Sequence, residues 1–281
     1  MHLVRTGDIP PNACDAHIHV FDRRFTETLA ADDISDGTAT VDAYRSVRSA
    51  FGTTRTVVVT PRNYDVDNAV TLDAIFQLGK DNARGIATLR PDVSDSHLQY
   101  LHDGGIRGIR FTLYTPEQAP TAFHMIAPLA HRVHDLGWHV QLHLTAQQIV
   151  DHRDLLSRLP TPLVFDHLGR LPQPDPCAHL ACRLITDWLG EGRAWVKLSA
   201  PYLDSQVGEQ HAFSDVDQVA RHWVRVAPGQ LVWGSDWPHT SLSTGIDSTR
   251  LLAKLKEWTG SEAAFEQILV HNPARLYGFP L

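Results

Sequence analysis

The sequence predicts an α/β protein that folds as one (β/α)₈ TIM barrel, a single domain over residues 1–281. Short β-rich segments recur at intervals of roughly 30 residues, and each is followed by a segment with helical periodicity. Eight such repeats fill nearly the whole chain, and a closed barrel buries eight parallel strands on both faces. A doubly wound open sheet is the alternative. No glycine-rich dinucleotide motif follows the first β-rich segment, which favours the barrel.

Each repeat contains one expected strand and one expected helix. The expected strands are residues 14–20, 56–59, 84–89, 106–111, 138–142, 163–165, 194–198 and 231–233. The expected helices are residues 41–50, 66–78, 94–102, 121–136, 146–155, 177–189, 214–226 and 248–258. Ser94 can cap the third helix, and Asn272-Pro273 is typical of the start of a terminal helix. Residues 22–40 form the longest irregular stretch, and we expect a loop over the barrel mouth there.

Composition limits the classes of partner. The chain has 25 Lys and Arg against 32 Asp and Glu, a formal charge of −7, which argues against nucleic acid or an anionic membrane as a partner. No segment approaches the ~18 apolar residues of a membrane span, and no leader pattern begins the chain, so we expect a soluble, cytoplasmic protein. A small molecule is the expected partner, and a homo-oligomer is compatible with the sequence.

The cysteines indicate reduced thiols. Cys14, Cys177 and Cys182 are odd in number and follow no secretion signal, which argues against a disulfide framework. Cys177 and Cys182 lie five residues apart, and no second pair completes a zinc site. We therefore expect no structural zinc there.

Histidines lie at the ends of several predicted strands. In segment 14–20, strand alternation places Asp15, His17 and His19 on one face, and the fifth strand is followed by His143. Inward histidines at the carboxyl ends of barrel strands can bind a metal ion or a substrate. Hydrogen-bonded core histidines are the structural alternative. The sixth strand is followed by His167.

An acidic residue, Asp236, follows the eighth predicted strand. An isolated aspartate in such a place is often only a helix cap, but here four strand-end histidines are expected at the same end of the barrel. The sequence therefore predicts a reaction centre at that end.

Three motifs in chain order resemble a known family. They are Ile-Arg-Gly-Ile-Arg-Phe at 106–111, Phe-Asp-His-Leu-Gly-Arg at 165–170 and Trp-Gly-Ser-Asp-Trp-Pro-His at 233–239. With the His-x-His of the first strand, they resemble the amidohydrolase superfamily over most of the chain. The pattern is most similar to the amidohydrolase-related branch that includes 2-pyrone-4,6-dicarboxylate hydrolase, sugar-acid lactonases, lactone isomerases and muconolactone-type hydrolases.

The resemblance implies a lactonase, a carboxylic ester hydrolase that opens a carboxylated or sulfonated lactone by metal-assisted attack of water. It implies a divalent metal, expected to be Zn²⁺, near His17, His19, His143 and Asp236. Asp236 would take the proton of the attacking water, and His167 would polarise the scissile carbonyl or help to hold the metal. The pyrone hydrolase carries Tyr where this chain has His143, which favours a metal here. A metal-free, hydrogen-bonded site is the alternative.

Arginines at strand ends suggest an anionic substrate. Arg110 has the parity of the barrel interior and can hold a carboxylate through two hydrogen bonds, although an ion pair with Asp or Glu would also explain it. Arg62, after the second strand, can supply another anion contact. Further candidate substrate-binding residues are Tyr114, Lys197, Tyr202 and His239.

Rival functions share the same barrel. A non-oxidative decarboxylase of an aromatic or unsaturated acid would use the same metal but protonate a carbon, and a sugar-lactone isomerase would release no net acid. A barrel that only binds an acidic metabolite is the rival from another class, since fold does not imply activity.

Overall fold

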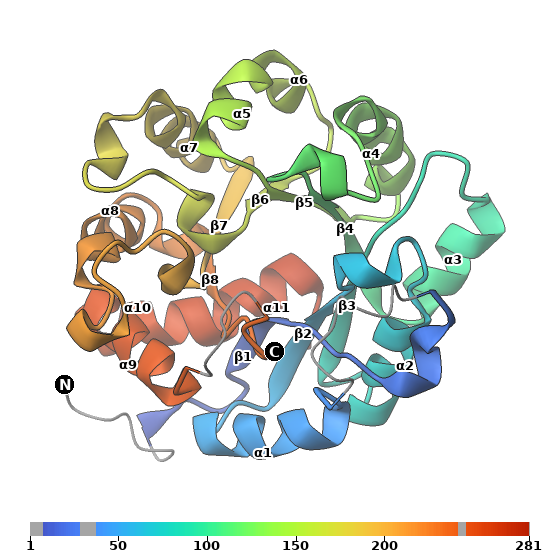
Figure 1. Ribbon diagram of the computed structural model, residues 1–281, viewed down its shortest axis with the longest axis horizontal. Coiled ribbons are helices and arrows are strands. Elements are labelled where there is room, and N and C mark those ends of the chain that lie inside the picture. Colours follow the sequence, from blue (N-terminus) through green and yellow to red (C-terminus); the bar gives the residue numbers. More distant parts are fainter. Residues whose placement is uncertain (1–7, 29–37, 241–245, 281) are drawn as a thin grey trace.

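Eight parallel strands form one barrel in the computed structural model, which describes residues 8–28, 38–240 and 246–280. Figure 1 shows the strands as an inner ring with the helices outside it. The spatial order of the strands follows the sequence. They are β1 (Cys14–Ile18), β2 (Arg55–Val59), β3 (Ala83–Ala87), β4 (Ile106–Thr112), β5 (His139–His143), β6 (Leu163–Phe165), β7 (Ala194–Leu198) and β8 (Leu231–Trp233). The predicted TIM barrel is confirmed.

The ring closes where β1 meets the segment after β8. Ile18 and Trp237 form a parallel bridge, the His19 amide donates to the Trp237 carbonyl at 2.8 Å, and the Asp236 amide donates to the His17 carbonyl at 2.9 Å. We call this junction the seam. Backbone hydrogen bonds fix the register of neighbouring strands. The seam therefore places His17 of β1, and His19 just after β1, next to Asp236.

The helices alternate with the strands along the chain and surround the barrel. They are α1 (Val41–Phe51), α2 (Ala69–Leu78), α3 (Asp95–Asp103), α4 (Ile126–His134), α5 (Ala146–Asp151), α6 (Arg153–Ser157), α7 (Leu180–Gly190), α8 (Asp217–Val226), α9 (Ser248–Thr259), α10 (Glu262–Glu266) and α11 (Asn272–Tyr277). Ser94 caps α3 by accepting from the His97 amide, and Pro273 lies in the first turn of α11, as predicted. No helix of the described residues is long and apolar enough to cross a bilayer.

Several predicted helices are shorter or more divided than expected, and the segments 121–136 and 146–155 are two examples. The segment 121–136 begins with a 3₁₀ turn at Phe123–Met125, so α4 starts only at Ile126. The segment 146–155 is divided at His152, whose φ of −104° is not helical and whose ring stacks on Phe123 with centroids 3.7 Å apart. Local periodicity does not encode such tertiary contacts.

Two expectations fall partly outside the described residues. Residues 29–37 of the loop expected at 22–40 are not described, and neither are residues 1–7, where no leader pattern was expected.

The amino-terminal end of the barrel is closed by the last helix. Tyr277 of α11 is fully buried, and its ring centroid lies 5.5 Å from that of His139, the first residue of β5. Arg84, on β3, donates to the Tyr277 and Gly278 carbonyls. The last helix thus covers this end, and a cavity lined by residues at and after the strand ends opens at the other end of the barrel.

The alternation predicted for the first strand is wrong at Asp15. The register of β1 against β2 shifts between Asp15 and Ile18. The Asp15 carboxylate therefore accepts from the hydroxyl of Tyr44 on α1 at 3.0 Å, while His17 contacts groups inside the barrel. Asp15 also accepts from the amide of Ser235 at 2.8 Å and from its hydroxyl at 2.6 Å. This buried carboxylate thus joins β1, α1 and the segment after β8.

We predict that Gly234→Ala destabilises the fold at the seam. A Cβ at this position would lie 2.5 Å from His17 Cβ and 2.7 Å from the His17 amide nitrogen, and backbone cannot rotate away. Overpacking of this kind costs about 2–3 kcal/mol of the free energy of unfolding, measured by urea titration. Gly229→Ala is the matched control, because a Cβ there meets nothing within 4 Å. Equal unfolding free energies for both variants would contradict the prediction.

Candidate active site

A cavity of about 310 Å³ opens where the strands end. Its lining comes from the ends of several strands and the loops that follow them, which is the arrangement of active sites in barrels of this type. The described residues that line it are His19, Phe21, Pro61, Arg62, Asn63, Arg110, Thr112, His143, His167, Leu203, Asp236 and Thr240. Five predicted site residues besides Asp236 are therefore brought to one cavity.

Two histidines and one carboxylate form a compact triangle at the seam. His17 Nε2 lies 3.2 Å from His19 Nε2 and 3.4 Å from Asp236 Oδ1, and His19 Nε2 lies 3.7 Å from the same oxygen. Ligands about 2.0–2.1 Å from a tetrahedral zinc ion are separated by roughly 3.3 Å, so this triangle has the dimensions of a metal site. His17, His19 and Asp236 are one of the candidate metal-binding groups among the described residues.

The surroundings leave both imidazoles neutral. Burial lowers the pKa of His19 to about 3, aided by the charge of Arg110, and burial also holds the pKa of His17 well below its usual value. His19 Nδ1 lies 2.8 Å from the Val59 carbonyl, which can only accept, so Nδ1 carries the proton and Nε2 presents its lone pair to the triangle. A neutral His19 oriented in this way is a suitable metal ligand.

Asp236 is buried and bridges the triangle to a tyrosine. Its Oδ2 accepts a short hydrogen bond from the Tyr202 hydroxyl, while Oδ1 faces the two histidines. Burial raises the pKa of Asp236 to about 7, although the Tyr202 hydroxyl and the charge of Arg110 act against this shift. The protein alone therefore does not fully neutralise the negative charge of this carboxylate, and a bound cation would supply the missing positive charge.

A buried ion pair lies beneath the cavity. Arg110 Nε donates to Asp166 Oδ2 at 2.9 Å, and Gln141 donates to the same oxygen at 3.1 Å. Burial alone would raise the pKa of Asp166, but Arg110, His17 and Lys197 together hold it well below its usual value. Arg110 thus forms the ion pair that was one of the two interpretations made from the sequence, and because it also lines the cavity, substrate contact stays a prediction.

His143 lines the cavity but does not join the triangle. Its Nε2 accepts from Arg170 Nη1 at 2.7 Å, and its Nδ1 is buried without a hydrogen-bond partner among the described residues. Arg170 is held by Asp204 and lies 4.0 Å above the ring of Tyr114, which in turn stacks on His143. His143 is absent from the candidate metal-binding groups of the described chain. The Nε2 lone pair of His143, the fourth metal ligand expected from the sequence, is therefore engaged by an arginine.

His167 lines the cavity beside two other site histidines, with its ring centroid 4.9 Å from that of His17 and 5.0 Å from that of His143. It has a left-handed φ of 51°, and its Nδ1 lies 3.0 Å from the Ser199 hydroxyl. Burial holds its pKa well below the usual value, so the ring is neutral. His167 also forms a second candidate metal-binding group with His17 and Asp166.

Four predicted substrate-binding residues lie outside the described cavity lining. Lys197 is fully buried, and its ammonium donates to the Ala16 carbonyl at 2.9 Å and lies 3.3 Å from His17 Nδ1. Tyr202 acts on Asp236. His239 Nε2 is held by the Ser235 carbonyl at 3.1 Å, and Tyr114 covers His143. These positions favour support of the centre over direct substrate contact.

Several residues of the site were not predicted as such. Asp15, Asp166 and Arg170 hold other site residues in place, and Asn63, Thr112 and Thr240 add polar groups to the cavity wall. Asp166 and Arg170 lie inside the motif at 165–170, so their strand-end position was a usable signal. Nothing in the sequence indicated which histidine Arg170 would contact.

Comparisons with known proteins match nearly the whole chain. The family model described as amidohydrolase matches residues 14–279. A 2-pyrone-4,6-dicarboxylate hydrolase of Comamonas testosteroni is 33% identical and a 4-sulfomuconolactone hydrolase of Hydrogenophaga intermedia is 30% identical; each alignment covers 96% of this chain and at least 90% of the relative. The solved structure of a probable 2-pyrone-4,6-dicarboxylic acid hydrolase from Acinetobacter baumannii with citric acid bound is 26% identical. Its TM-score is 0.80, with 95% of this chain and 100% of that chain covered.

We predict that Asp166→Asn lowers the free energy of unfolding by about 3–5 kcal/mol at pH 7, because it leaves Arg110 buried without its counter-charge. The folded-state pKa of Asp166 is depressed, so this contribution is present above the unfolded pKa of about 3.9 and is lost as the pH falls further. The difference in unfolding free energy between variant and parent, measured by urea titration, should become smaller below about pH 4.

The matched control is Asp154→Asn. The Asp154 side chain is 76% exposed and lies 3.7 Å from Arg153, so its removal should change stability little. A similarly small effect for Asp166→Asn would contradict the importance of the buried pair.

Proposed function

Because the chain belongs to the amidohydrolase family, we propose that it is a hydrolase that opens a lactone ring bearing a carboxylate or sulfonate. The observation that carries the proposal is the triangle of His17, His19 and Asp236 at the wall of a cavity that also contains two arginines. The triangle can activate water, and the arginines can hold an anion beside it. The relatives named above for lactone hydrolysis support the same reaction.

We assign His17, His19 and Asp236 as the ligands of one divalent cation, with zinc as the expected ion. Their mutual distances of 3.2–3.7 Å and the neutral state of both imidazoles fit zinc. Burial disfavours the ionised form of Asp236, and a nearby cation would stabilise that form. A zinc ion bound there would act as a Lewis acid toward water and toward the ester carbonyl. His143 Nε2 accepts from Arg170, so its buried Nδ1, which has no partner among the described residues, carries the ring proton and is a candidate hydrogen-bond donor to the substrate.

The protein supplies the proton transfers. Asp236 takes the proton of the attacking water, while the Tyr202 hydroxyl holds the other carboxylate oxygen and so fixes its orientation. His167 accepts at Nδ1 from Ser199 in the tautomer that leaves a proton on Nε2, and this N–H can donate a hydrogen bond to the carbonyl oxygen of the lactone, where negative charge develops. The ring C–O bond then breaks, Asp236 returns the proton taken from water to the leaving ring oxygen, and the product is a hydroxy acid.

Arg62 and Arg110 bind the acidic substituent of the substrate. Arg110 is fixed by Asp166 below the cavity, whereas Arg62 lies on the loop after β2 and donates to Gln118 at 2.8 Å. Guanidinium groups bind carboxylate or sulfonate oxygens in pairs, and two such groups in one cavity favour an anionic lactone over a neutral one. Thr112 and Thr240 offer hydroxyls to the ring oxygens.

We predict that Asp236→Asn lowers kcat for lactone opening by at least about 100-fold, because the amide cannot take a proton from water. The assay follows acid release from carboxylated lactones with the metal-loaded protein. Asp247→Asn is the matched control, since Asp247 is a half-exposed cap of α9. Parental turnover in Asp236→Asn would remove the proposed base.

The same assay separates the rival functions. Carbon dioxide released from an aromatic acid, with no opening of lactones, would indicate a decarboxylase. Conversion of one lactone to another without acid release would indicate an isomerase. A protein that binds the lactones without turning them over would be a binding protein only.

We predict that Arg62→Gln raises KM for a carboxylated lactone by roughly 10-fold while kcat changes little, because a charge-assisted hydrogen bond to the substrate is lost. A neutral lactone with the same ring should show no such change. Arg153→Gln, on the outer helix α6, is the matched control. An equal rise in KM for both substrates would show that Arg62 does not bind the charged substituent of the lactone.

A further inference from the structure

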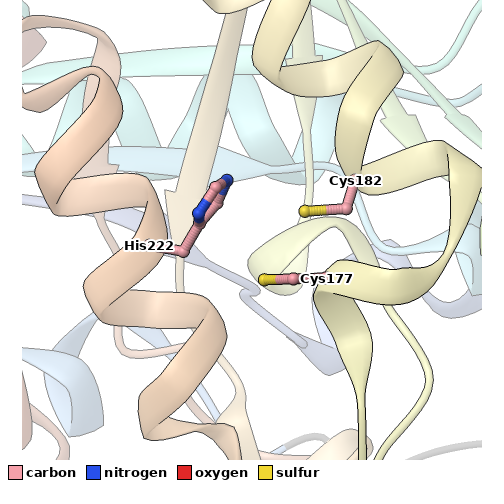
Figure 2. Close-up of side chains that lie close together, drawn as sticks. All are labelled: Cys177, Cys182 and His222. Carbon is pink, nitrogen blue, oxygen red and sulfur yellow. The ribbon is translucent and has the colours of Figure 1, made fainter.

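A second cluster of metal-ligating side chains lies in the helical layer. Cys177 comes from a 3₁₀ turn at Pro176–Ala178, Cys182 from the first turn of α7, and His222 from α8. Figure 2 shows the two sulfurs and the imidazole pointing into the same space between the helices. The potential ligand atoms all lie within 4.8 Å of one another. We call these three residues the thiol cluster.

We propose that the thiol cluster is a metal site for a thiophilic divalent cation such as Zn²⁺, separate from the active site. Two thiolates and one imidazole are a ligand set typical of zinc, and a water molecule can complete the tetrahedron. The cation would bind α7 to α8 and to the turn that precedes α7. The cluster has no carboxylate among its ligands, which makes it softer than the triangle at the seam.

The environment gives the cluster access to ions and a defined geometry. Cys182 is buried, whereas Cys177 and His222 are partly exposed, so the site is reached from solvent. Thr186 donates to the Cys182 carbonyl at 2.8 Å and lies 3.1 Å from His222 Nε2, so it connects the two helices at the cluster. Both helices therefore keep their spacing before an ion binds.

The imidazole has to exchange two hydrogen bonds on binding. Arg225 Nη2 can only donate, so it donates a hydrogen bond to His222 Nδ1 at 3.2 Å, and the neutral ring then carries its proton on Nε2 toward Thr186. Binding through Nε2 requires this proton to move to Nδ1, so the ring gives up its contacts with both Thr186 and Arg225. Because these contacts are partly exposed, water replaces them at little cost.

A metal ion has to displace a proton from the buried cysteine. Burial, aided by the charge and the hydrogen bond of the neighbouring Cys177, raises the pKa of the Cys182 thiol to about 12. An ion that binds there releases the Cys182 proton, as at other thiolate sites.

Cobalt absorption tests the proposal on the full-length protein. The protein is stripped with a chelator, kept reduced with a phosphine, and titrated with CoCl₂, which gives a thiolate-to-metal charge-transfer band only where cysteine is a ligand. We expect the band to saturate at about one equivalent bound by the cluster and to disappear on addition of ZnCl₂. His19→Ala should leave the band unchanged, because the triangle contains no sulfur.

The variants separate the cluster from the third cysteine. Cys182→Ser and Cys177→Ser should abolish the band, His222→Ala should weaken cobalt affinity at least about 10-fold, and Cys14→Ala, the matched control, should retain the band. In the parent protein, ZnCl₂ should slow alkylation of Cys177 and Cys182 at least about 10-fold, which tests the site without any variant.

Three results would overturn the proposal. They are the absence of a charge-transfer band in the parent protein at excess cobalt, a band of equal size in Cys182→Ser, and alkylation that zinc does not slow. A Cys177–Cys182 disulfide that forms in place of metal binding would identify the cluster as a redox pair instead.

Discussion

The seam between β1 and the segment after β8 is the constraint on which the centre depends. Two backbone hydrogen bonds, His19 to Trp237 and Asp236 to His17, close the barrel and bring the triangle of His17, His19 and Asp236 together in one step. The Asp15 carboxylate reinforces this closure from the helical side through Ser235. Barrel closure and assembly of the site are therefore the same structural event, and damage to the seam should affect stability and chemistry together.

Burial of charge determines how the centre is built around the seam. Arg110 and Asp166 neutralise each other under the cavity, which keeps a guanidinium fixed at its wall. The neighbouring histidines remain neutral because burial and nearby cations oppose their protonation. Asp236, at the cavity wall, is not fully neutralised, and its raised pKa marks a place where positive charge is missing. This imbalance distinguishes Asp236 from Asp166, whose pKa is held well below its usual value.

The sequence predicted the barrel and most strand bounds because strand-to-helix alternation and side-chain period are local properties. It also predicted that His19, His143, His167 and Asp236 would meet, since parallel strands end at one rim. It could not predict the register shift that turns Asp15 toward α1, which depends on pairing with β2.

Non-local contacts account for the other differences. Lys197 had the correct parity, but its ammonium bonds beneath His17 and does not reach the cavity, because strand parity fixes the face and not the depth. The thiol cluster was missed because His222 lies 40 residues beyond Cys182 on another helix, and only packing brings them together.

The central claim is that His17, His19 and Asp236 bind one divalent cation at the seam. Anomalous diffraction at the zinc edge from zinc-loaded crystals tests this claim most directly. The account predicts a peak at about 2 Å from His17 Nε2, His19 Nε2 and Asp236 Oδ1, and a seam without such a peak would contradict it.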